Sequence, residues 1–251
     1  MDLYSIPVYY ISFSSKEKVE SKLKDLGFKH VYHFPAIRGK ELSVPKLVKG
    51  RIISERVYDD LRLGRTEHSG MPSLGGIGCT LSHYAIWKKC FDDENCKAVM
   101  ILEDDVILPN QIKDEDVDNI VKTINQPNGI FISANVTRQD KRLHFFGTHF
   151  YIVSKGACKK LMDKAFPIDS QTDWYISHIG TIKDINLHGY EIVPQYKNKK
   201  SSIQDGCIMC FFPRDNRFYI VFFTVVGLLL IFFIYNYYSL HKTIKMYKNR
   251  G

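Results

Sequence analysis

The sequence predicts an α/β domain followed by a single membrane-spanning helix. Three observations support this fold class: a strand–helix–strand pattern opens the chain, a later apolar strand ends in three acids, and an uncharged apolar run lies near the C-terminus. At 251 residues, the chain is long enough for one medium-sized domain with a proper core and a short appendage. Its 45% hydrophobic and 25% charged residues are typical of a globular protein rather than a disordered one.

The N-terminal segment carries the strand–helix–strand pattern. Residues 6–13 are β-rich and largely apolar, which predicts a buried first strand. Residues 14–27 open with two serines that can cap a helix, continue with apolar residues at helical spacing and end in a glycine. Residues 28–37 then predict a second strand that leads into a loop. This order is typical of an α/β domain.

The middle of the chain predicts a long excursion before the next strand. Residues 39–76 are mixed and basic with several glycines, a composition that suits a mobile lid. A helix is expected over residues 78–91, and residues 97–102 predict a short buried strand. The acids at 103–105 follow directly, at the carboxyl end of that strand.

The C-terminal apolar run is the clearest physical signal in the sequence. Residues 218–238 carry no charge, and a bilayer core needs about 20 apolar residues in a helix. Arginines precede the run and tyrosines crowd its end, as expected of a membrane span. The alternative is a buried core helix, but core helices rarely run this long without a polar face. The sequence therefore predicts a folded domain at 1–213, a transmembrane helix with its flanks at 214–240 and a short basic tail at 241–251.

Two features point to opposite sides of the membrane for the folded domain. Residues 1–13 have neither the basic start nor the long apolar stretch of a signal peptide, so a C-terminal anchor favours a cytosolic domain. The tail, however, carries four basic residues, and such a segment itself prefers the cytoplasm. Without these four residues the net charge falls from +8 to +4, which is ordinary for a soluble domain. We therefore expect no nucleic-acid partner, although the pI is near 9.0.

The cysteines do not have the spacing of a disulfide framework. The six are Cys79, Cys90, Cys96, Cys158, Cys207 and Cys210. The last two form a lone Cys-Ile-Met-Cys motif, whereas a zinc site usually needs a second pair. Ordinary thiols, or palmitoylation sites beside the membrane, are the alternatives. Residues 135–137 form a sequon that could accept an N-glycan only if the domain were luminal.

The three acids after the predicted strand indicate a metal site. Carboxylates crowded together in a dry setting would repel one another, and a divalent cation removes that conflict. Open α/β sheets bind ligands beyond the carboxyl ends of their strands, which is where these acids lie. On an extended segment Glu103 and Asp105 point to one side and Asp104 to the other. The alternative is a solvated acidic turn.

Two blocks of sequence carry a family resemblance. Residues 76–88, GIGCTLSHYAIWK, and residues 99–106, VMILEDDV, resemble the pattern of glycosyltransferase family 25, which includes lipopolysaccharide and collagen galactosyltransferases. Further matching segments are 35–42, 147–161, 173–174 and 201–203. The resemblance covers nearly all of residues 5–205 and leaves out the membrane segment.

This resemblance implies a GT-A-like fold, which is a single Rossmann-type domain that binds a nucleotide sugar. The implied reaction transfers a hexose, galactose or glucose, from a UDP-sugar to a glycan, lipid or protein acceptor with inversion. Glu103 and Asp105 would form a DxD-like pair that holds Mn²⁺ or Mg²⁺, with Asp105 as the more direct ligand. Glu103 or Asp104 would contact the nucleotide ribose. The metal would neutralise charge on the leaving diphosphate.

An inverting transfer also needs a general base that accepts the proton of the acceptor hydroxyl. Asp173 is the first candidate for this base and Asp169 is the second. Trp174 could offer a face for sugar stacking, or it could belong to the core. Other histidines, including His178 and His188, could complete the metal shell, but nothing in their spacing selects one.

Other polar residues of the matching blocks have both a functional and a structural interpretation. Ser82 and His83 lie near a predicted helix N-terminus, where backbone N–H groups favour anions. They could therefore contact the donor diphosphate, or they could hold the helix in place. Arg38 and Lys40 could meet donor phosphates or line a solvated loop.

Three hypotheses for the function follow from these patterns. The favoured one is an active, membrane-anchored glycosyltransferase. The second is a membrane-anchored protein that keeps the fold and only binds a ligand or partner, but a pure binding module has no need of clustered acids. The third is a nucleotidyltransferase, which would be expected to carry a glycine-rich phosphate loop after the first strand. The segment SFSSKEK has no glycine, so this hypothesis ranks last.

Overall fold

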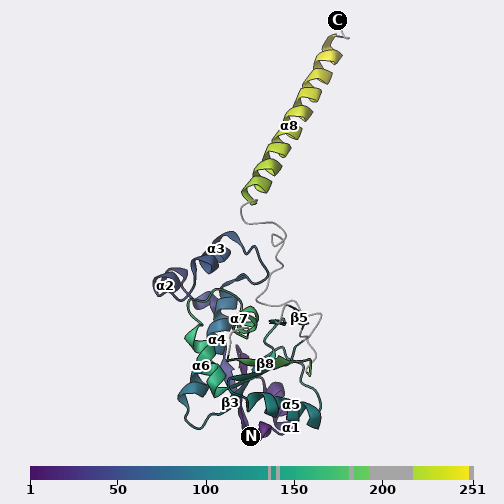
Figure 1. The fold of residues 1–251 in the computed structure, drawn as a ribbon. Helices are drawn as coiled ribbons and strands as arrows, with labels where there is room; N and C mark the ends of the chain where they lie inside the picture. Colours follow the sequence, from purple (N-terminus) through teal and green to yellow (C-terminus); the bar gives the residue numbers. More distant parts are fainter. Residues whose placement is uncertain (135–136, 140–141, 181–183, 193–216, 249–251) are drawn as a thin grey trace. The chain divides into compact units, whose positions relative to one another are not determined.

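The computed structural model divides the chain into two units, Met1–Cys207 and Ile208–Gly251, which we describe separately (Figure 1). The residues described are 1–134, 137–139, 142–180, 184–192 and 217–248. Three features of the sequence lie wholly or partly outside them: the sequon at 135–137, the closing family segment at 201–203 and the Cys207–Cys210 motif.

A mixed six-stranded sheet with the order β2-β1-β3-β7-β4-β8 forms the centre of the first unit. Its strands are β1 Pro7–Ser12, β2 His30–Pro35, β3 Ala98–Glu103, β4 Gly129–Ile132, β7 Phe150–Ser154 and β8 Asn186–Gly189. Strand β1 is parallel to β2 and β3, and β4 is parallel to β8. Strand β7 is antiparallel to both of its neighbours, β3 and β4. A separate hairpin pairs β5 Thr137–Gln139 with β6 Arg142–His144.

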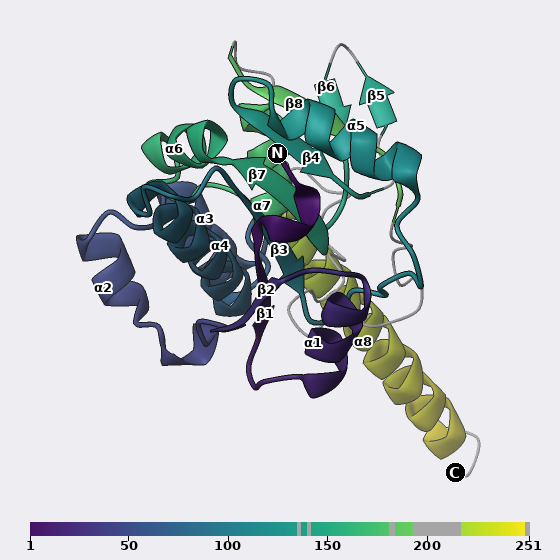
Figure 2. The same ribbon diagram turned by 90° about the horizontal axis from the view of Figure 1, so that it is seen from below.

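Helices cover both faces of the sheet, which confirms the predicted α/β fold (Figure 2). The helices that pack on the sheet are α1 Glu17–Asp25, α4 Leu74–Asp92, α5 Asp114–Ile124, α6 Lys155–Asp163 and α7 Thr172–Ile179. Strand β3 shows why both faces are buried. Val99 and Ile101 point into the core shared with α4, α6 and α7. Met100 and Leu102 point into the core shared with α1 and α5, as the alternation of a strand requires.

The excursion at residues 39–76 contains more regular structure than the sequence indicated. It holds a short 3₁₀ helix, Gly39–Glu41, and two α-helices, α2 Val44–Lys49 and α3 Glu55–Leu63. Ser54 caps α3 by accepting a hydrogen bond from the Val57 N–H at 3.2 Å. Both helices contribute to a small separate core with α4, so this segment is packed rather than open. Helix α4 also begins earlier than expected, because the Ser73 hydroxyl caps it at the Gly75 N–H.

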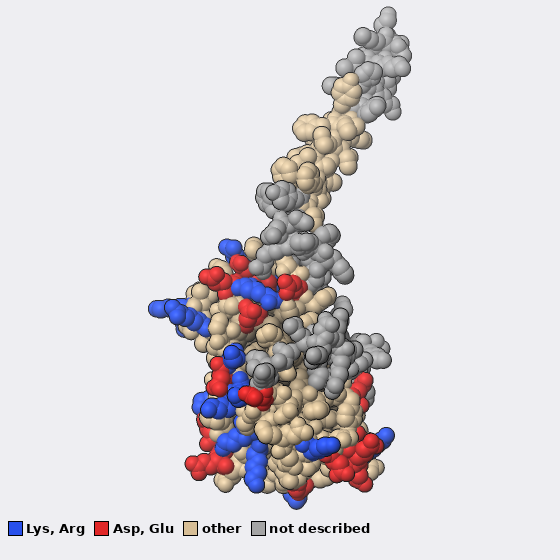
Figure 3. Space-filling view, in the orientation of Figure 1, with Lys and Arg blue, Asp and Glu red and all other residues tan. Residues whose placement is uncertain are grey.

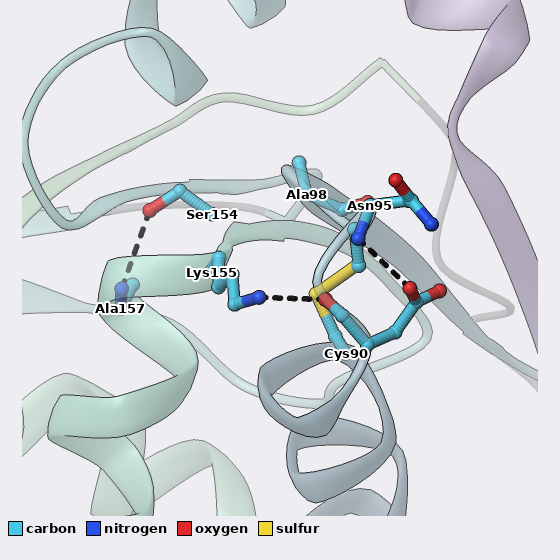
Figure 4. Close-up of a disulfide and its surroundings, with 8 residues drawn as sticks. Cys90, Asn95, Ala98, Ser154, Lys155 and Ala157 are labelled. Carbon is cyan, nitrogen blue, oxygen red and sulfur yellow. Dashed lines mark hydrogen bonds between the residues drawn. A yellow bond between two sulfur atoms is a disulfide. The ribbon is translucent and has the colours of Figure 1, made fainter.

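A disulfide joins the end of α4 to the start of β3 (Figure 4). Cys90 and Cys96 lie 5.4 Å apart between Cα atoms. Asp93 shapes the turn between them, because its carbonyl accepts from the Cys96 N–H and its carboxylate from the Asn95 N–H. The cysteine spacing, which indicated no disulfide framework, therefore did not predict this bond, because it did not show that this turn brings the two sulfurs together. Cys79 and Cys158 are free.

The second unit contains a single long helix, α8 Arg217–Lys248. Its segment Ile220–Tyr237 has a mean hydropathy of 2.3, and none of it is buried in the protein. Figure 3 shows no charged side chain on the part of this helix that is coloured by residue type. By length and composition this segment could cross a membrane. On the first unit, the same view shows side chains of both charges interspersed.

Candidate active site

The three acids lie at one edge of the sheet, directly after β3. Glu103 is the last residue of this strand, and the Val106 N–H closes a turn onto its carbonyl. The side chains then diverge, although residues 104 and 105 lie in this turn and not on the extended segment that was expected from the sequence. Asp104 forms an ion pair with Lys16, which precedes α1, at 2.9 Å. Glu103 and Asp105 both face His149.

A short loop before β7, residues 147–149, contacts three different acids. The Gly147 N–H donates a hydrogen bond to Asp173 Oδ2 at 2.9 Å. The Thr148 hydroxyl donates to Glu103 Oε1, and His149 Nδ1 lies 3.0 Å from Asp105 Oδ1. We call this segment the acid-binding loop. It joins the DxD-like pair to the predicted general base, so the structure brings these predicted site residues together.

His149 is the residue of this site that sequence reasoning missed. Its Nδ1 atom lies 3.8 Å from Glu103 Oε2 in addition to its contact with Asp105. Together, Glu103, Asp105 and His149 offer three ligand atoms that lie within 4.8 Å of one another. The hydrogen bond that His149 donates to Asp105 and the charges of the neighbouring acids raise the pKa of His149 to about 9, although burial opposes this. The acids therefore favour the positively charged form of the His149 side chain.

Glu103 is held in its ionised form by the groups around it. Burial alone would raise the pKa of Glu103, but hydrogen bonds from His83 and Thr148 and the charges of His83 and His149 lower it to about 2. His83 Nε2 lies 3.3 Å from Glu103 Oε1, whereas Oε2 is the oxygen that faces His149. One carboxylate oxygen is thus occupied by the protein, and the other faces the possible metal position.

A buried polar network of His83, Trp87 and Tyr151 holds Glu103 in position. The Tyr151 hydroxyl accepts a hydrogen bond from Trp87 Nε1 at 2.9 Å and lies 2.8 Å from His83 Nδ1. All three side chains are fully buried. If Tyr151 donates its proton to His83 Nδ1, the other ring nitrogen carries the proton that bonds Glu103. Both ring nitrogens of His83 therefore bond to protein groups, and its predicted contact with the donor diphosphate stays a prediction.

Ser82 is also fully enclosed and joins two parts of the family pattern. Its hydroxyl donates to the Gly78 carbonyl at 2.8 Å and accepts from the Ile37 N–H at 2.9 Å. A Cβ atom on Gly78 would lie 2.3 Å from the Ile37 carbonyl oxygen, so this helix position requires glycine. These contacts hold the loop after β2 against α4, and a donor-binding role for Ser82 stays a prediction.

Asp173 is a buried carboxylate in the first turn of α7. Its Oδ1 atom accepts from the Trp174 N–H at 2.8 Å, in addition to the bond from Gly147. Burial raises the pKa of Asp173, and the charge of Glu103 adds to this, although the backbone hydrogen bonds oppose it. Trp174 is only partly buried and packs edge-on against the exposed Phe146, with ring centroids 6.0 Å apart.

Asp169, the second candidate for the base, makes its contacts elsewhere. Its carboxylate accepts from the Ser54 hydroxyl and lies 3.6 Å from Arg56. These partners belong to the start of α3, so Asp169 ties the α2–α3 segment to the loop before α7. The structure thus separates the roles of the two aspartates, since Asp173 alone contacts the acid-binding loop.

Arg38 lies after β2, beside the end of β1. Its guanidinium stands 5.0 Å from the centre of the Phe13 ring and 3.7 Å from Glu41. Phe13 is exposed at this edge, and Lys16 follows three residues later. Two cations and one aromatic ring therefore lie at the carboxyl ends of β1 and β2. No described contact joins Arg38 to the three acids, and its role stays a prediction.

His178 and His188 were named from the sequence as possible further metal ligands. Neither is among the described contacts of the three acids. His178 lies in the last turn of α7, and His188 is exposed on β8. The signal that could have identified His149 is its position directly after Gly147-Thr148, a pair that belongs to the family pattern.

Comparisons with known proteins identify a family for most of this chain. The model of the family described as Glycosyltransferase family 25 (LPS biosynthesis protein) matches residues 7–176. A Glycosyltransferase 25 family member from Drosophila melanogaster is 30% identical over 177 residues, which is 61% of this chain and 27% of that protein. The same-named protein from Drosophila pseudoobscura pseudoobscura is 33% identical over 115 residues, or 46% of this chain and 17% of that protein. The chain thus spans only about a quarter of these relatives or less.

A solved structure described as a glucose-1-phosphate thymidylyltransferase from Bacillus anthracis covers 74% of this chain and 87% of its own. Its sequence identity is 10% and its TM-score is 0.36, so it carries no argument about function. The family match covers every strand of the six-stranded sheet except β8, together with the three acids and Asp173. The chain belongs to glycosyltransferase family 25.

Proposed function

We propose that this chain is a metal-dependent glycosyltransferase that moves a hexose from a UDP-sugar to a hydroxyl acceptor with inversion. The observation that carries the proposal is the acid-binding loop, because it fixes a buried carboxylate with a raised pKa beside the carboxylates of Glu103 and Asp105. A transferase of this kind needs both a cation site for the leaving diphosphate and a base for the acceptor. A module that only binds a ligand needs neither.

The residues at the end of β3 fit a divalent cation. Glu103 and Asp105 offer oxygen atoms that face a common point, and hard cations such as Mg²⁺ and Mn²⁺ take carboxylate oxygens. When bound, the ion would supply positive charge to the leaving diphosphate. Glu103 is kept ionised by His83 and Thr148, so it can act as a ligand throughout the neutral pH range.

Asp173 is the residue that we assign as general base. Its burial raises its proton affinity, and a base works best when its pKa approaches the working pH. The Gly147 and Trp174 N–H groups fix the orientation of its carboxylate. The acceptor hydroxyl would give its proton to this carboxylate as the hydroxyl oxygen attacks the sugar.

The donor side of the site would be formed by the ends of β1 and β2. Lys16 and Arg38 supply positive charge there, which suits phosphate oxygens. The exposed Phe13 ring, next to the Arg38 guanidinium, offers a flat surface that suits the nucleotide base.

The test is a donor panel with the detergent-solubilised full chain. UDP release is measured with each UDP-sugar, with and without Mn²⁺, in the parent, in Asp105→Ala and in Asp118→Asn as a control. Asp118 is an exposed carboxylate on α5. We expect one donor to give metal-dependent release, a loss of about 10²–10³-fold in Asp105→Ala, because a charge-stabilising contact is removed, and no change in the control.

Three results would contradict this proposal. Absence of release with every donor would favour the alternative of an inactive binding protein with the same fold. Release of diphosphate from a nucleoside triphosphate would favour a nucleotidyltransferase. Full activity of Asp105→Ala would show that the acids do not form a working metal site.

We also propose that α8 anchors the protein in a membrane. Its uncharged segment, residues 220–237, has the length and hydropathy of a bilayer span. An anchored enzyme would meet its glycan, lipid or protein acceptor at, or close to, a membrane surface. Equal activity of anchored and anchor-free forms on a membrane-bound acceptor would remove the support for this role.

A further inference from the structure

We propose that His149 is a third protein ligand of the metal that Glu103 and Asp105 hold, and that its nitrogen makes the site prefer Mn²⁺ to Mg²⁺. This inference rests on the proposed function, because it concerns the metal of that site. It adds a ligand that the DxD-like pattern does not contain and that precedes, rather than follows, a strand.

The orientation of the imidazole ring supports this role. Nδ1 is the nitrogen that faces the acids, at 3.0 Å from Asp105 Oδ1 and 3.8 Å from Glu103 Oε2. Nε2 lies on the other side, over Gly147, since a Cβ atom there would be 2.6 Å from it. The ring thus presents one defined nitrogen to the position between the two carboxylates, and an ion that binds there would displace to solvent the proton that Nδ1 shares with Asp105. Its side chain is 29% exposed, which leaves a route for an ion and its waters.

The backbone fixes this nitrogen relative to the acids. The Glu103 N–H donates to the His149 carbonyl at 3.1 Å, which extends the β3–β7 ladder by one residue. Thr148, on the preceding position, holds the far oxygen of Glu103. The backbone hydrogen bond and the Thr148 contact therefore position His149 beside Glu103 before any ion binds, as expected of a preorganised ligand set.

A second group of possible ligands nearby is less suitable. Cys79, His83 and Glu103 also lie within 4.8 Å of one another. Burial raises the pKa of the Cys79 thiol well above its usual value, so the thiolate that binds metals is disfavoured. Both nitrogens of His83 already bond to Tyr151 and Glu103.

The nitrogen has a consequence for metal choice. Mg²⁺ is bound through oxygen and keeps several waters, so an imidazole in its shell is unfavourable. First-row transition ions accept imidazole nitrogen in addition to carboxylate oxygen. One nitrogen among two carboxylates therefore shifts the preference of the site from Mg²⁺ towards Mn²⁺.

Mn²⁺ bound to the full chain tests this proposal without any turnover. Pulsed electron paramagnetic resonance detects coupling of Mn²⁺ to a directly bound nitrogen. We expect such a coupling in the parent protein, a changed coupling when histidine is labelled with ¹⁵N, and its loss in His149→Gln. Titrations should show a loss of Mn²⁺ affinity of at least about tenfold in His149→Gln. The loss of Mg²⁺ affinity should be smaller. His188→Gln, an exposed histidine on β8, should match the parent.

The outcomes separate this inference from the proposed function. Mn²⁺ that binds through Asp105 without nitrogen coupling would overturn the role of His149 and leave the proposed metal site intact. Mn²⁺ that does not bind to the parent at all would overturn both. The ¹⁵N labelling uses the parent protein, so the absence of a histidine coupling there would overturn the role of His149 even if His149→Gln folds poorly.

Discussion

At the scale of single residues, Gly147 has two roles that no other residue type can combine. Its φ of +82° lies in the left-handed region that glycine adopts without strain. It also lies directly under the His149 ring, where a Cβ atom would be 2.6 Å from Nε2. Its N–H meanwhile binds Asp173. The absence of a side chain here allows one short loop to hold both the base and the histidine.

Gly147→Ala should therefore reduce both stability and metal binding. The backbone strain costs about 1–3 kcal/mol of unfolding free energy, and the added methyl group displaces the His149 ring. Urea unfolding measures the first effect and Mn²⁺ titration the second. Gly27→Ala is the matched control, because Gly27 also has a positive φ of +99° but meets only Tyr4 at 3.4 Å. It should lose stability and keep its Mn²⁺ affinity. Equal Mn²⁺ affinity in both variants would contradict the role of Gly147.

The two candidate bases give opposite predictions. Asp173→Asn keeps the shape of the buried side chain and removes the proton acceptor, so kcat should fall by about 10²–10⁴-fold while donor KM changes little. Asp169→Asn should keep kcat, because Asp169 contacts Ser54 and Arg56 instead. The measurement is steady-state UDP release for both variants. The raised pKa of Asp173 also predicts that the parent loses activity on acidification at a higher pH than an ordinary aspartate would give. A large loss of activity in Asp169→Asn alone would reverse the assignment.

At the scale of elements, the Cys90–Cys96 disulfide closes the short connection between α4 and β3. Closing so small a loop restricts the unfolded chain and stabilises the fold by about 2 kcal/mol in the chain-entropy model. Reductant should lower the free energy of unfolding of the parent by this amount, which appears as a lower urea midpoint. It should have no effect on a Cys90→Ser/Cys96→Ser double variant, whereas Cys79→Ser should respond as the parent does. An equal midpoint of the parent with and without reductant would show that the bond is absent or contributes nothing.

The same bond bears on the side of the membrane. Disulfides persist in oxidising compartments and are rare in the cytosol. The bond thus opposes the cytosolic side that the sequence of residues 1–13 favoured, and it agrees with the basic tail. Alkylation of the protein inside intact cells, without reductant, should leave Cys90 and Cys96 unmodified. Modification of both would restore the cytosolic assignment.

The elements also show which parts of the fold could be predicted from sequence. The strands β1, β2 and β3 and helix α1 were found because each has a local signal: an apolar β-rich run for the strands, and apolar residues at helical spacing with a terminal glycine for the helix. The predicted cap by the serines at 14 and 15 was wrong, because α1 begins after Lys16 and has no side-chain cap. Helices α2 and α3 were missed because their apolar residues face only a small separate core, so the pattern is weak. His149 was missed because the sequence of β7 alone does not indicate the direction in which this strand runs. Only pairing with β3 and β4 determines it.

At the scale of the whole molecule, the folded unit and α8 differ in the exposure of their large apolar side chains. The first unit buries its large apolar residues, whereas the segment Ile220–Tyr237 leaves them exposed. The full chain should therefore remain in the membrane fraction after alkaline carbonate washing, and a chain that ends at residue 213 should not. Leu229→Arg, near the middle of the segment, should weaken retention, since a central arginine costs about 3 kcal/mol. Gly227→Ala, which meets nothing within 4 Å, should not. Retention of the shortened chain would place the membrane contact elsewhere.

The reversed strand β7 also determines how freely this protein can diverge. Because β7 runs antiparallel to β3, Leu102 pairs with Phe150, and the residues that follow one strand lie beside those that precede the other. The register of this single pair of strands fixes the acids and the histidine together. The loops of the stretch between residues 106 and 146 could therefore change without moving the acids or the histidine, whereas α5 and β4 belong to the sheet and its core. Evolution could refashion those loops for new acceptors, and a protein engineer could graft foreign loops there, without rebuilding the chemistry.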